Sequence, residues 1–211
     1  MTSQPSSIKT TMRLPEKTPV KWAVWPLWAL ATTAGITLGF VFSYVVLFAI
    51  KAVVRDFNED KWMGYWLVPI LAVGVTVLQW LILRRYIARA GGWIVASLSG
   101  WVIAIFVSQF ITRSLYALWP RITPADWALY SFIIILFAFG LVMGTIQWLV
   151  LRQHVRGAGV WMLANVAGLA VARWMIGVSI DRFADVVALG ALPGIVTGLA
   201  LAWLLRGTAA H

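Results

Sequence analysis

Six long runs of apolar residues divide the chain, and polar or charged breaks separate them. Each run is close to or above the roughly 20 residues with which a helix crosses the hydrocarbon core of a bilayer. No run alternates apolar and polar residues as a barrel strand does, and spanning backbone must satisfy its own hydrogen bonds. The pattern predicts an all-α polytopic membrane protein with six transmembrane helices, at 25–50, 65–83, 93–111, 128–151, 160–178 and 186–205.

Polar segments flank this predicted domain of residues 25–206. Residues 1–24 hold serine, threonine, proline and lysine without an apolar core, which predicts a disordered or surface-lying tail. Residues 207–211 form a short C-terminal tail.

Composition supports a membrane protein and offers little for catalysis. Hydrophobic residues make up 62% of the 211 residues, charged residues only 11%, and the mean hydropathy is +0.87. Soluble domains rarely have so little polar surface. There is no cysteine, and both histidines, His154 and His211, lie outside the apolar runs. Without a thiolate, an intramembrane histidine or a recognisable catalytic motif, we predict no catalytic residue, no metal site and no enzyme activity. The expected small molecule is bound lipid, with a non-covalent pigment or quinone as the alternative.

The formal net charge of +10 is unevenly distributed between the two predicted faces. One face carries a single acidic residue, Glu16, and ten basic residues: Lys9, Arg13, Lys17, Lys21, Arg84, Arg85, Arg89, Arg152, Arg156 and Arg206. The other carries six of the seven acidic residues. The positive-inside rule therefore places both termini in the cytoplasm, and we expect the cytoplasmic (inner) membrane of a bacterium, with anionic lipids beside the basic face. Nucleic acid is not an expected partner, because topology accounts for the basic residues.

Two segments of the chain repeat each other. Residues 79–101 align without gaps with 147–169, and ten of the 23 positions are identical. Each copy runs from Gln-Trp-Leu-x-Leu-Arg through a short turn with Ala-Gly to a tryptophan, Trp93 or Trp161. A Trp-x-Leu-Ala-x-x-x-Gly pattern also starts the first run at Trp28, and a weaker copy of the other motif, with Ala202 in place of glutamine, ends the last run. We therefore predict three tandem two-helix repeats about an axis along the membrane normal.

These motifs resemble uncharacterised bacterial multi-pass membrane proteins with the same repeated hairpin. The resemblance covers about residues 28–206 and rests on Trp93, Gln147, Trp148, Arg152, Ala158, Gly159 and Trp161. It implies the architecture and a bacterial origin, and the third copy departs from it at Ala202.

Tryptophan and arginine at the ends of the runs are typical of membrane-interface anchors. We assign this role to Trp80, Arg84, Trp93, Trp148, Arg152, Trp161, Trp203 and Arg206, and Trp28 fits the same pattern.

The glutamines need another explanation, since an amide in hydrocarbon requires partners. Gln79 and Ser97, and likewise Gln147 and Asn165, are 18 residues apart on consecutive antiparallel runs, at similar depth. We predict that each pair forms an interhelical clamp by hydrogen bonding across the cytoplasmic turn. The alternative is a polar ring that binds a head group or solute.

The seam between the first and last runs lacks such an amide clamp. Glycines at four-residue spacing are predicted to allow close helix packing there and elsewhere, at Gly35, Gly39, Gly140, Gly144, Gly190, Gly194 and Gly198. The alternative is that glycine is simply common in membrane helices.

On the opposite face, Arg173, Trp119 and Trp127 are candidates for a partner or ligand contact. For Arg173 the plainer interpretation is a salt bridge to Asp181 or a side chain extended to the interface.

Two functions fit these features. The first is a non-catalytic membrane subunit or scaffold that packs against other membrane protein subunits of a larger complex, respiratory or photosynthetic for example. The second is a transporter of small molecules or lipids, or the substrate-binding membrane component of one. A cavity lined by Gln79, Gln147 and Asn165 would favour the second, and a filled core would favour the first.

Overall fold

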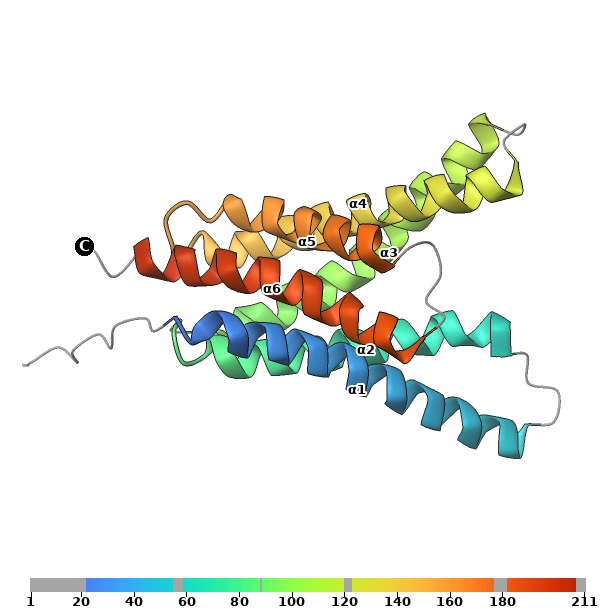
Figure 1. Ribbon diagram of the computed structural model, residues 1–211, viewed down its shortest axis with the longest axis horizontal. Coiled ribbons are helices and arrows are strands. Elements are labelled where there is room, and N and C mark those ends of the chain that lie inside the picture. The colour runs from blue at the N-terminus through green and yellow to red at the C-terminus, as the bar shows by residue number, and fades with distance from the viewer. Residues whose placement is uncertain (1–21, 55–58, 88, 120–122, 177–181, 208–211) are drawn as a thin grey trace, which may run out of the picture.

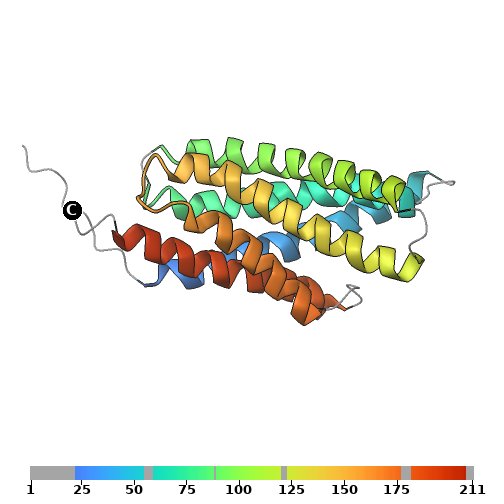
Figure 2. The same cartoon turned by 90° about the horizontal axis from the view of Figure 1, so that it is seen from above.

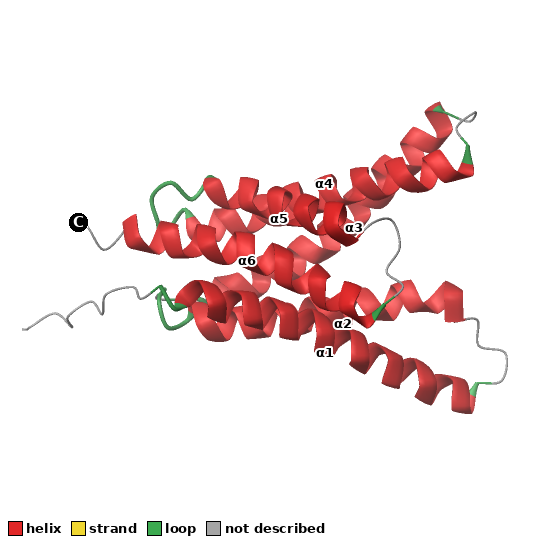
Figure 3. Cartoon of the chain, in the orientation of Figure 1, coloured by secondary structure: helices red, strands yellow, loops and turns green. Residues whose placement is uncertain are grey.

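The computed structural model describes residues 22–54, 59–87, 89–119, 123–176 and 182–207 (Figure 1). Over these residues the chain is all-helical, with helices joined by turns (Figure 3). The six helices are α1 (Val24–Val53), α2 (Glu59–Leu83), α3 (Gly91–Leu118), α4 (Pro124–Leu151), α5 (Val160–Ile176) and α6 (Phe183–Gly207). All six apolar runs are therefore helices. α3 continues seven residues beyond its predicted end at residue 111. Residues 1–21 of the predicted tail lie outside the described residues, and α1 begins at the last residue of that tail, Val24.

Several helices have the length and composition of membrane spans. Four apolar segments are long enough to cross a bilayer: Val24–Val53, Gly91–Leu118, Ile133–Leu151 and Phe183–Arg206. The apolar parts of the other two helices, Leu67–Leu83 and Val160–Ile176, are shorter. Large apolar side chains also point outward, such as Phe106 and Leu163, which is the reverse of a soluble bundle.

The helices form a closed ring in which each helix packs against two neighbours (Figures 1 and 2). Five of the six contacts join helices that are consecutive in the chain, and the sixth joins α1 to α6. α2 and α3 make the least extensive contact of any neighbouring pair.

One end of the bundle gathers the start of α1, the end of α6 and the turns at residues 84–90 and 152–159 (Figure 1). We call it the turn end. The two turns use the same backbone device at positions 68 residues apart, since Arg89 has a φ of 60° and Gly157 a φ of 72°. Glycine adopts this left-handed conformation at little cost, whereas arginine does not. At the other end, the far end, α3 and α4 diverge from α1 and α2 (Figure 1).

The main hydrophobic core lies at the turn end. It includes three tryptophans and several leucines from the C-terminal turns of the even-numbered helices. The cluster is Val24, Trp28, Leu83, Ile87, Trp93, Leu151, Val155, Ala158, Trp161, Leu201, Ala202, Leu204 and Leu205.

All seven of the singled-out glycines face a neighbouring helix at short range. A β-carbon on Gly35 would lie 2.6 Å from Val75 Cα, and Gly39 faces Leu71 of the same helix, α2. Gly140 and Gly144 face Val166 and Met162 of α5. At Gly35 and Gly144 a β-carbon would collide with backbone, and at Gly39 and Gly140 it would be tighter than an ordinary contact, so glycine sets the distance between the helices.

The seam between α1 and α6 is closely packed, although no turn connects these helices. β-Carbons on Gly190 and Gly194 would lie 2.7 Å from Thr33 Cα and 3.0 Å from Ala29 Cα, and one on Gly198 would lie 2.7 Å from Trp25 O. Small residues thus pack this seam, where the last helix has Ala202 in place of the glutamine of Gln79 and Gln147.

Candidate functional site: a central cavity above a tryptophan triad

Three tryptophans, Trp28, Trp93 and Trp161, meet at the centre of the turn end; we call them the tryptophan triad. Their indole centroids lie 5.6 Å (Trp28–Trp93), 5.7 Å (Trp28–Trp161) and 5.6 Å (Trp93–Trp161) apart, and all three pairs are edge-to-face. This is the geometry that aromatic quadrupoles favour. The triad therefore closes one end of the bundle interior.

The expectation that Trp93 and Trp161 anchor the chain at the membrane interface is wrong, and so is that for Trp28. All three side chains are essentially fully buried. They occupy the first turns of α1, α3 and α5, where an anchor would also lie, but closure of the helix ring turns them toward its axis. The position of a residue in the sequence sets its depth along the helix axis. Whether its side chain faces the inside or the outside of the bundle depends on where the neighbouring helices pack.

Two of the three indole N–H groups have partners. Trp28 Nε1 donates to Thr197 Oγ1 of α6 at 3.1 Å, and Trp161 Nε1 donates to Gln147 Oε1 of α4 at 2.9 Å. Trp93 Nε1 is buried without a hydrogen-bond partner among the described residues. Trp93 aligns in the sequence with Trp161, which bonds the helix before its own, and the corresponding neighbour of Trp93 is α2.

The glutamines do form interhelical hydrogen bonds, but not with the predicted partners. Gln79 Nε2 donates to Thr32 Oγ1 of α1 at 3.0 Å instead of to Ser97, and Gln147 Nε2 donates to Ser97 Oγ of α3 at 3.1 Å instead of to Asn165. Gln79 thus binds the helix before its own, where the α1–α2 contact is more extensive than the α2–α3 contact, whereas Gln147 binds the helices on both sides, since it also accepts from Trp161 of α5. Asn165 Nδ2 donates within α5, to Trp161 O at 2.9 Å.

These bonds fix the orientation of all three amides. The Thr32 hydroxyl donates its only proton to Trp28 O, so it can only accept from Gln79 and must face the amide nitrogen. The Trp161 indole N–H can only donate, so it must face the amide oxygen of Gln147. The backbone carbonyl of Trp161 can only accept, so it must face the amide nitrogen of Asn165. Gln79 Oε1 and Asn165 Oδ1 accept no hydrogen bond from the described residues.

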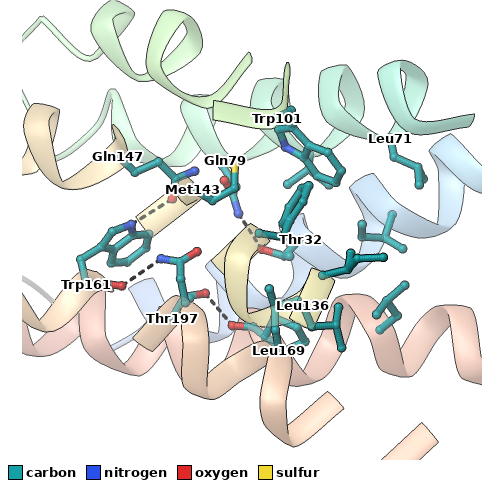
Figure 4. Close-up of a pocket in the computed structure, with 17 residues that line it drawn as sticks. Thr32, Leu71, Gln79, Trp101, Leu136, Met143, Gln147, Trp161, Leu169 and Thr197 are labelled. Atoms are coloured by element: carbon teal, nitrogen blue, oxygen red, sulfur yellow. Dashed lines mark hydrogen bonds between the residues drawn. The ribbon is translucent and has the colours of Figure 1, made fainter. Parts of the chain in front are cut away.

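A cavity of about 240 Å³ lies inside the ring, next to the triad (Figure 4). All six helices contribute to its wall. Its polar side chains are Thr32, Gln79, Gln147, Asn165 and Thr197, and its apolar wall includes Leu71, Trp101, Leu136, Met143 and Leu169 (Figure 4). The cavity is partly open rather than sealed. The alternative interpretation of the glutamines, a polar ring that binds a solute, thus has a space to fill.

No aspartate, glutamate, lysine, arginine or histidine lines this cavity. Among the residues that the structure describes, no group of three histidine or acidic side chains could hold a metal ion. What the site offers is neutral hydrogen bonding from amides and hydroxyls within an apolar wall.

Two arginine–tryptophan pairs remain at the surface of the turn end. Arg84 Cζ lies 5.1 Å from the Trp80 indole centroid, and Arg152 Cζ lies 4.9 Å from that of Trp148, so each guanidinium covers the preceding tryptophan. Both indoles are half-buried. Stacking suits an arginine anchored by an aromatic side chain at an interface.

The third motif differs. Trp203 is exposed, and Arg206 stacks instead on Trp22, with its Cζ 3.3 Å from the indole centroid. This contact again ties the two ends of the described chain together.

The candidates on the opposite face lie at the far end of the bundle and do not meet the cavity. Trp119 is exposed just after α3, and Arg173 is half-buried in the last turn of α5. The side chain of Trp127 and the suggested partner Asp181 lie outside the described residues.

Sequence reasoning missed Thr197 as a site residue. It lies three residues after Gly194 and one before Gly198, on the side of α6 that faces α1. A polar residue in phase with a glycine ridge is the signal that could have identified it. Trp101 and Met143 were missed as well, because nothing in the apolar runs marks cavity-lining positions.

Comparison of this chain with protein-family models, with curated proteins and with solved structures found no match.

Proposed function

We propose that this protein binds a small lipophilic molecule or a lipid inside a bacterial inner membrane, as a transporter or as the substrate-binding component of one. The observation that carries this proposal is the central cavity lined by Gln79, Gln147 and Asn165. A scaffold has no need for such a space, because a filled core is more stable than an empty one.

In this proposal all six helices cross the membrane. α5 has 17 residues, about 25 Å at roughly 1.5 Å per residue, which is at the short end of the range for a span. The shortness of α5 fits neighbours that hold it in the bundle. The basic turns with Arg84, Arg89, Arg152 and Arg156 lie at the turn end, which we place in the cytoplasm with both termini.

Three features support the threefold repeat. Equivalent tryptophans of the three hairpins form the triad, Gln79 and Gln147 bind equivalent positions on their partner helices, and the two turns share a left-handed residue. The cavity then lies on the pseudo-threefold axis, immediately above the triad on the membrane side.

The cavity volume indicates what it can hold. A buried apolar cavity of about 150 Å³ accommodates benzene, and pockets for drug-sized ligands begin at about 300 Å³. At about 240 Å³ the space fits a small molecule or the head of a longer amphiphile whose chain leaves through the open side.

The scaffold function remains a second candidate. The glycine ridges do not support it, because these glycines contact neighbouring helices inside the bundle and are not available to a partner subunit. The observation that favours it is the exposure of Trp119 and Trp174, which could dock another membrane subunit.

A matched pair of variants tests the binding function. Leu169→Trp fills the cavity, whereas Leu163→Trp makes the same change on the outward face of the same helix. We expect mass spectrometry of the mildly purified protein to find one class of lipophilic molecule in the wild type and in Leu163→Trp, at about one per chain, and to find it lost in Leu169→Trp.

Equal amounts in all three proteins, or none in the wild type, would contradict the binding function. Protein subunits that co-purify with Leu169→Trp but not with Trp119→Ala would favour the scaffold instead.

A further inference from the structure

We infer that the ligand of the central cavity is uncharged and that it carries a hydroxyl group, which donates its proton to the carbonyl oxygen of Gln79 or of Asn165. The inference rests on the proposed binding function and narrows it to a chemical class, such as a lipid alcohol. It excludes acyl anions, and it disfavours molecules that can only accept hydrogen bonds, such as an oxidised quinone.

The absence of charge in the cavity wall excludes an ionised ligand. A carboxylate or ammonium in an apolar site is strongly unfavourable unless an opposite charge accompanies it. None of the residues that line this cavity is ionisable. The basic residues of the turn end lie on the other side of the tryptophan triad, which separates them from the cavity.

The preference for a donor follows from the fixed amides. Every amide nitrogen of Gln79, Gln147 and Asn165 already donates one hydrogen bond, and Gln147 Oε1 is occupied by Trp161. Each amide keeps a second N–H, and Trp101, which also lines the cavity, has an indole N–H without a hydrogen bond among the described residues, so the wall can donate as well. The acceptors Gln79 Oε1 and Asn165 Oδ1 have no donor among the described residues, so a ligand that also donates gains a hydrogen bond that an acceptor-only ligand cannot make. Gln79 is only 7% exposed, so bulk solvent does little to satisfy its oxygen.

Rotating the Gln79 amide would not remove this preference. It would place Oε1 against Thr32 Oγ1, whose single proton would then have to leave Trp28 O, so two hydrogen bonds would be replaced by one. A ligand hydroxyl suits the unrotated amide, since its proton goes to a carbonyl oxygen and its own oxygen can accept the second amide hydrogen.

The chain of the ligand has an apolar path. Beyond the amides the wall is formed by Ile36, Leu71, Ile135, Leu136 and Leu189, which lie farther from the turn end along their helices. The hydroxyl is therefore expected near the triad, with the hydrocarbon chain directed away from the turn end.

A competition experiment tests the inference. Purified protein in detergent is incubated with equal concentrations of 1-decanol and 2-decanone, the complex is isolated by gel filtration, and the released ligands are quantified by mass spectrometry. Leu169→Trp, with its cavity filled, gives the background from the micelle. We expect about a tenfold preference for the alcohol, the ratio that one additional hydrogen bond typically confers. Decanoate should be retained no better than background.

Variants locate the preference. Gln79→Met and Asn165→Leu keep the side-chain size but remove the carbonyl oxygen, so each should bring the alcohol-to-ketone ratio toward one. Ser99→Ala removes a hydroxyl that bonds only within α3 and does not line the cavity, and it should keep the wild-type ratio.

The wild-type result decides the matter even if a variant fails to fold. Retention of both ligands in equal amounts, or of decanoate above background, overturns the inference and leaves the binding function standing. Retention of neither alcohol nor ketone above background refutes both.

Discussion

Helices joined by a short turn are expected to pack more closely than helices from opposite ends of the chain, but the α2–α3 and α1–α6 seams show the reverse. α2 and α3 are joined by a short turn, yet they pack least, and no interhelical hydrogen bond or glycine contact links them among the described residues. α1 and α6 come from opposite ends of the chain, yet three glycines bring their backbones together and Trp28 bonds Thr197. A covalent turn holds two helices close without further contacts, whereas a seam without a turn must be built entirely from packing.

The largest effect should follow from filling the α1–α6 seam. In Gly190→Ala the new methyl group would lie 2.7 Å from the backbone of Thr33, which cannot move aside as a side chain can. We expect the free energy of unfolding to fall by about 1–3 kcal/mol, measured by thermal or denaturant unfolding in detergent. Gly91→Ala, in open space at the start of α3, is the control and should change it little. Equal stability of the two variants would show that the seam is loose.

The indole N–H groups compare the two seams directly. Trp28→Phe removes a hydrogen bond between α1 and α6, whereas Trp93→Phe removes a donor that has no partner. Because the lost ring volume is the same, Trp28→Phe should be less stable than Trp93→Phe by about 1 kcal/mol in the same unfolding experiment. The reverse order would mean that Trp93 gains a partner in the membrane, with Gln79 Oε1 of α2 as the first candidate.

The turns give a smaller effect. Gly157→Ala, in the α4–α5 turn, places a β-carbon at a φ of 72° and should cost about 1 kcal/mol of unfolding free energy. Arg89→Gly, at the equivalent place between α2 and α3, relieves that strain but makes the unfolded chain more flexible. Its net change should lie within about 0.5 kcal/mol. A large loss in Arg89→Gly would show that a stiff turn holds α2 against α3.

The smallest change in the free energy of unfolding is expected for the exposed arginine at the start of the α2–α3 turn, Arg84. Arg84→Gln removes the stacking on Trp80 and should reduce the free energy of unfolding by about 0.5–1 kcal/mol. Arg152→Gln is its counterpart between α4 and α5 and should behave alike. A clearly larger loss for Arg84→Gln would indicate that this contact compensates for the weak packing of α2 on α3.

Much of the architecture could be predicted from the sequence. The apolar runs indicated the six helices, and the repeat indicated the tight basic turns, because both depend on local chemistry. The face that each helix turns inward could not be predicted. The same first-turn position suits a membrane anchor and a buried tryptophan, and only closure of the ring distinguishes them for Trp93 and Trp161.

The amide partners show the same limit. Spacing along the chain placed Gln147 at the depth of both Ser97 and Asn165, so depth alone could not choose between them. In the structure Gln147 donates to Ser97 and accepts from Trp161, and Asn165 donates to Trp161 O within its own helix. The cavity was likewise beyond sequence reasoning, because its volume is what remains after six helices have found their distances.

Because α1 contacts α6, the ring of helices could be opened at a different turn while the neighbours of every helix stay the same. Val24 and Gly207 lie at the same end, so a turn as short as residues 84–90 or 152–159 could join them and complete the third hairpin connection (Figure 1). The chain could then be opened at either natural turn instead. Circular permutants of this kind are tolerated where new termini fall in exposed turns and the packing is unchanged. The chain then has three interchangeable starting points, one before each tryptophan of the triad.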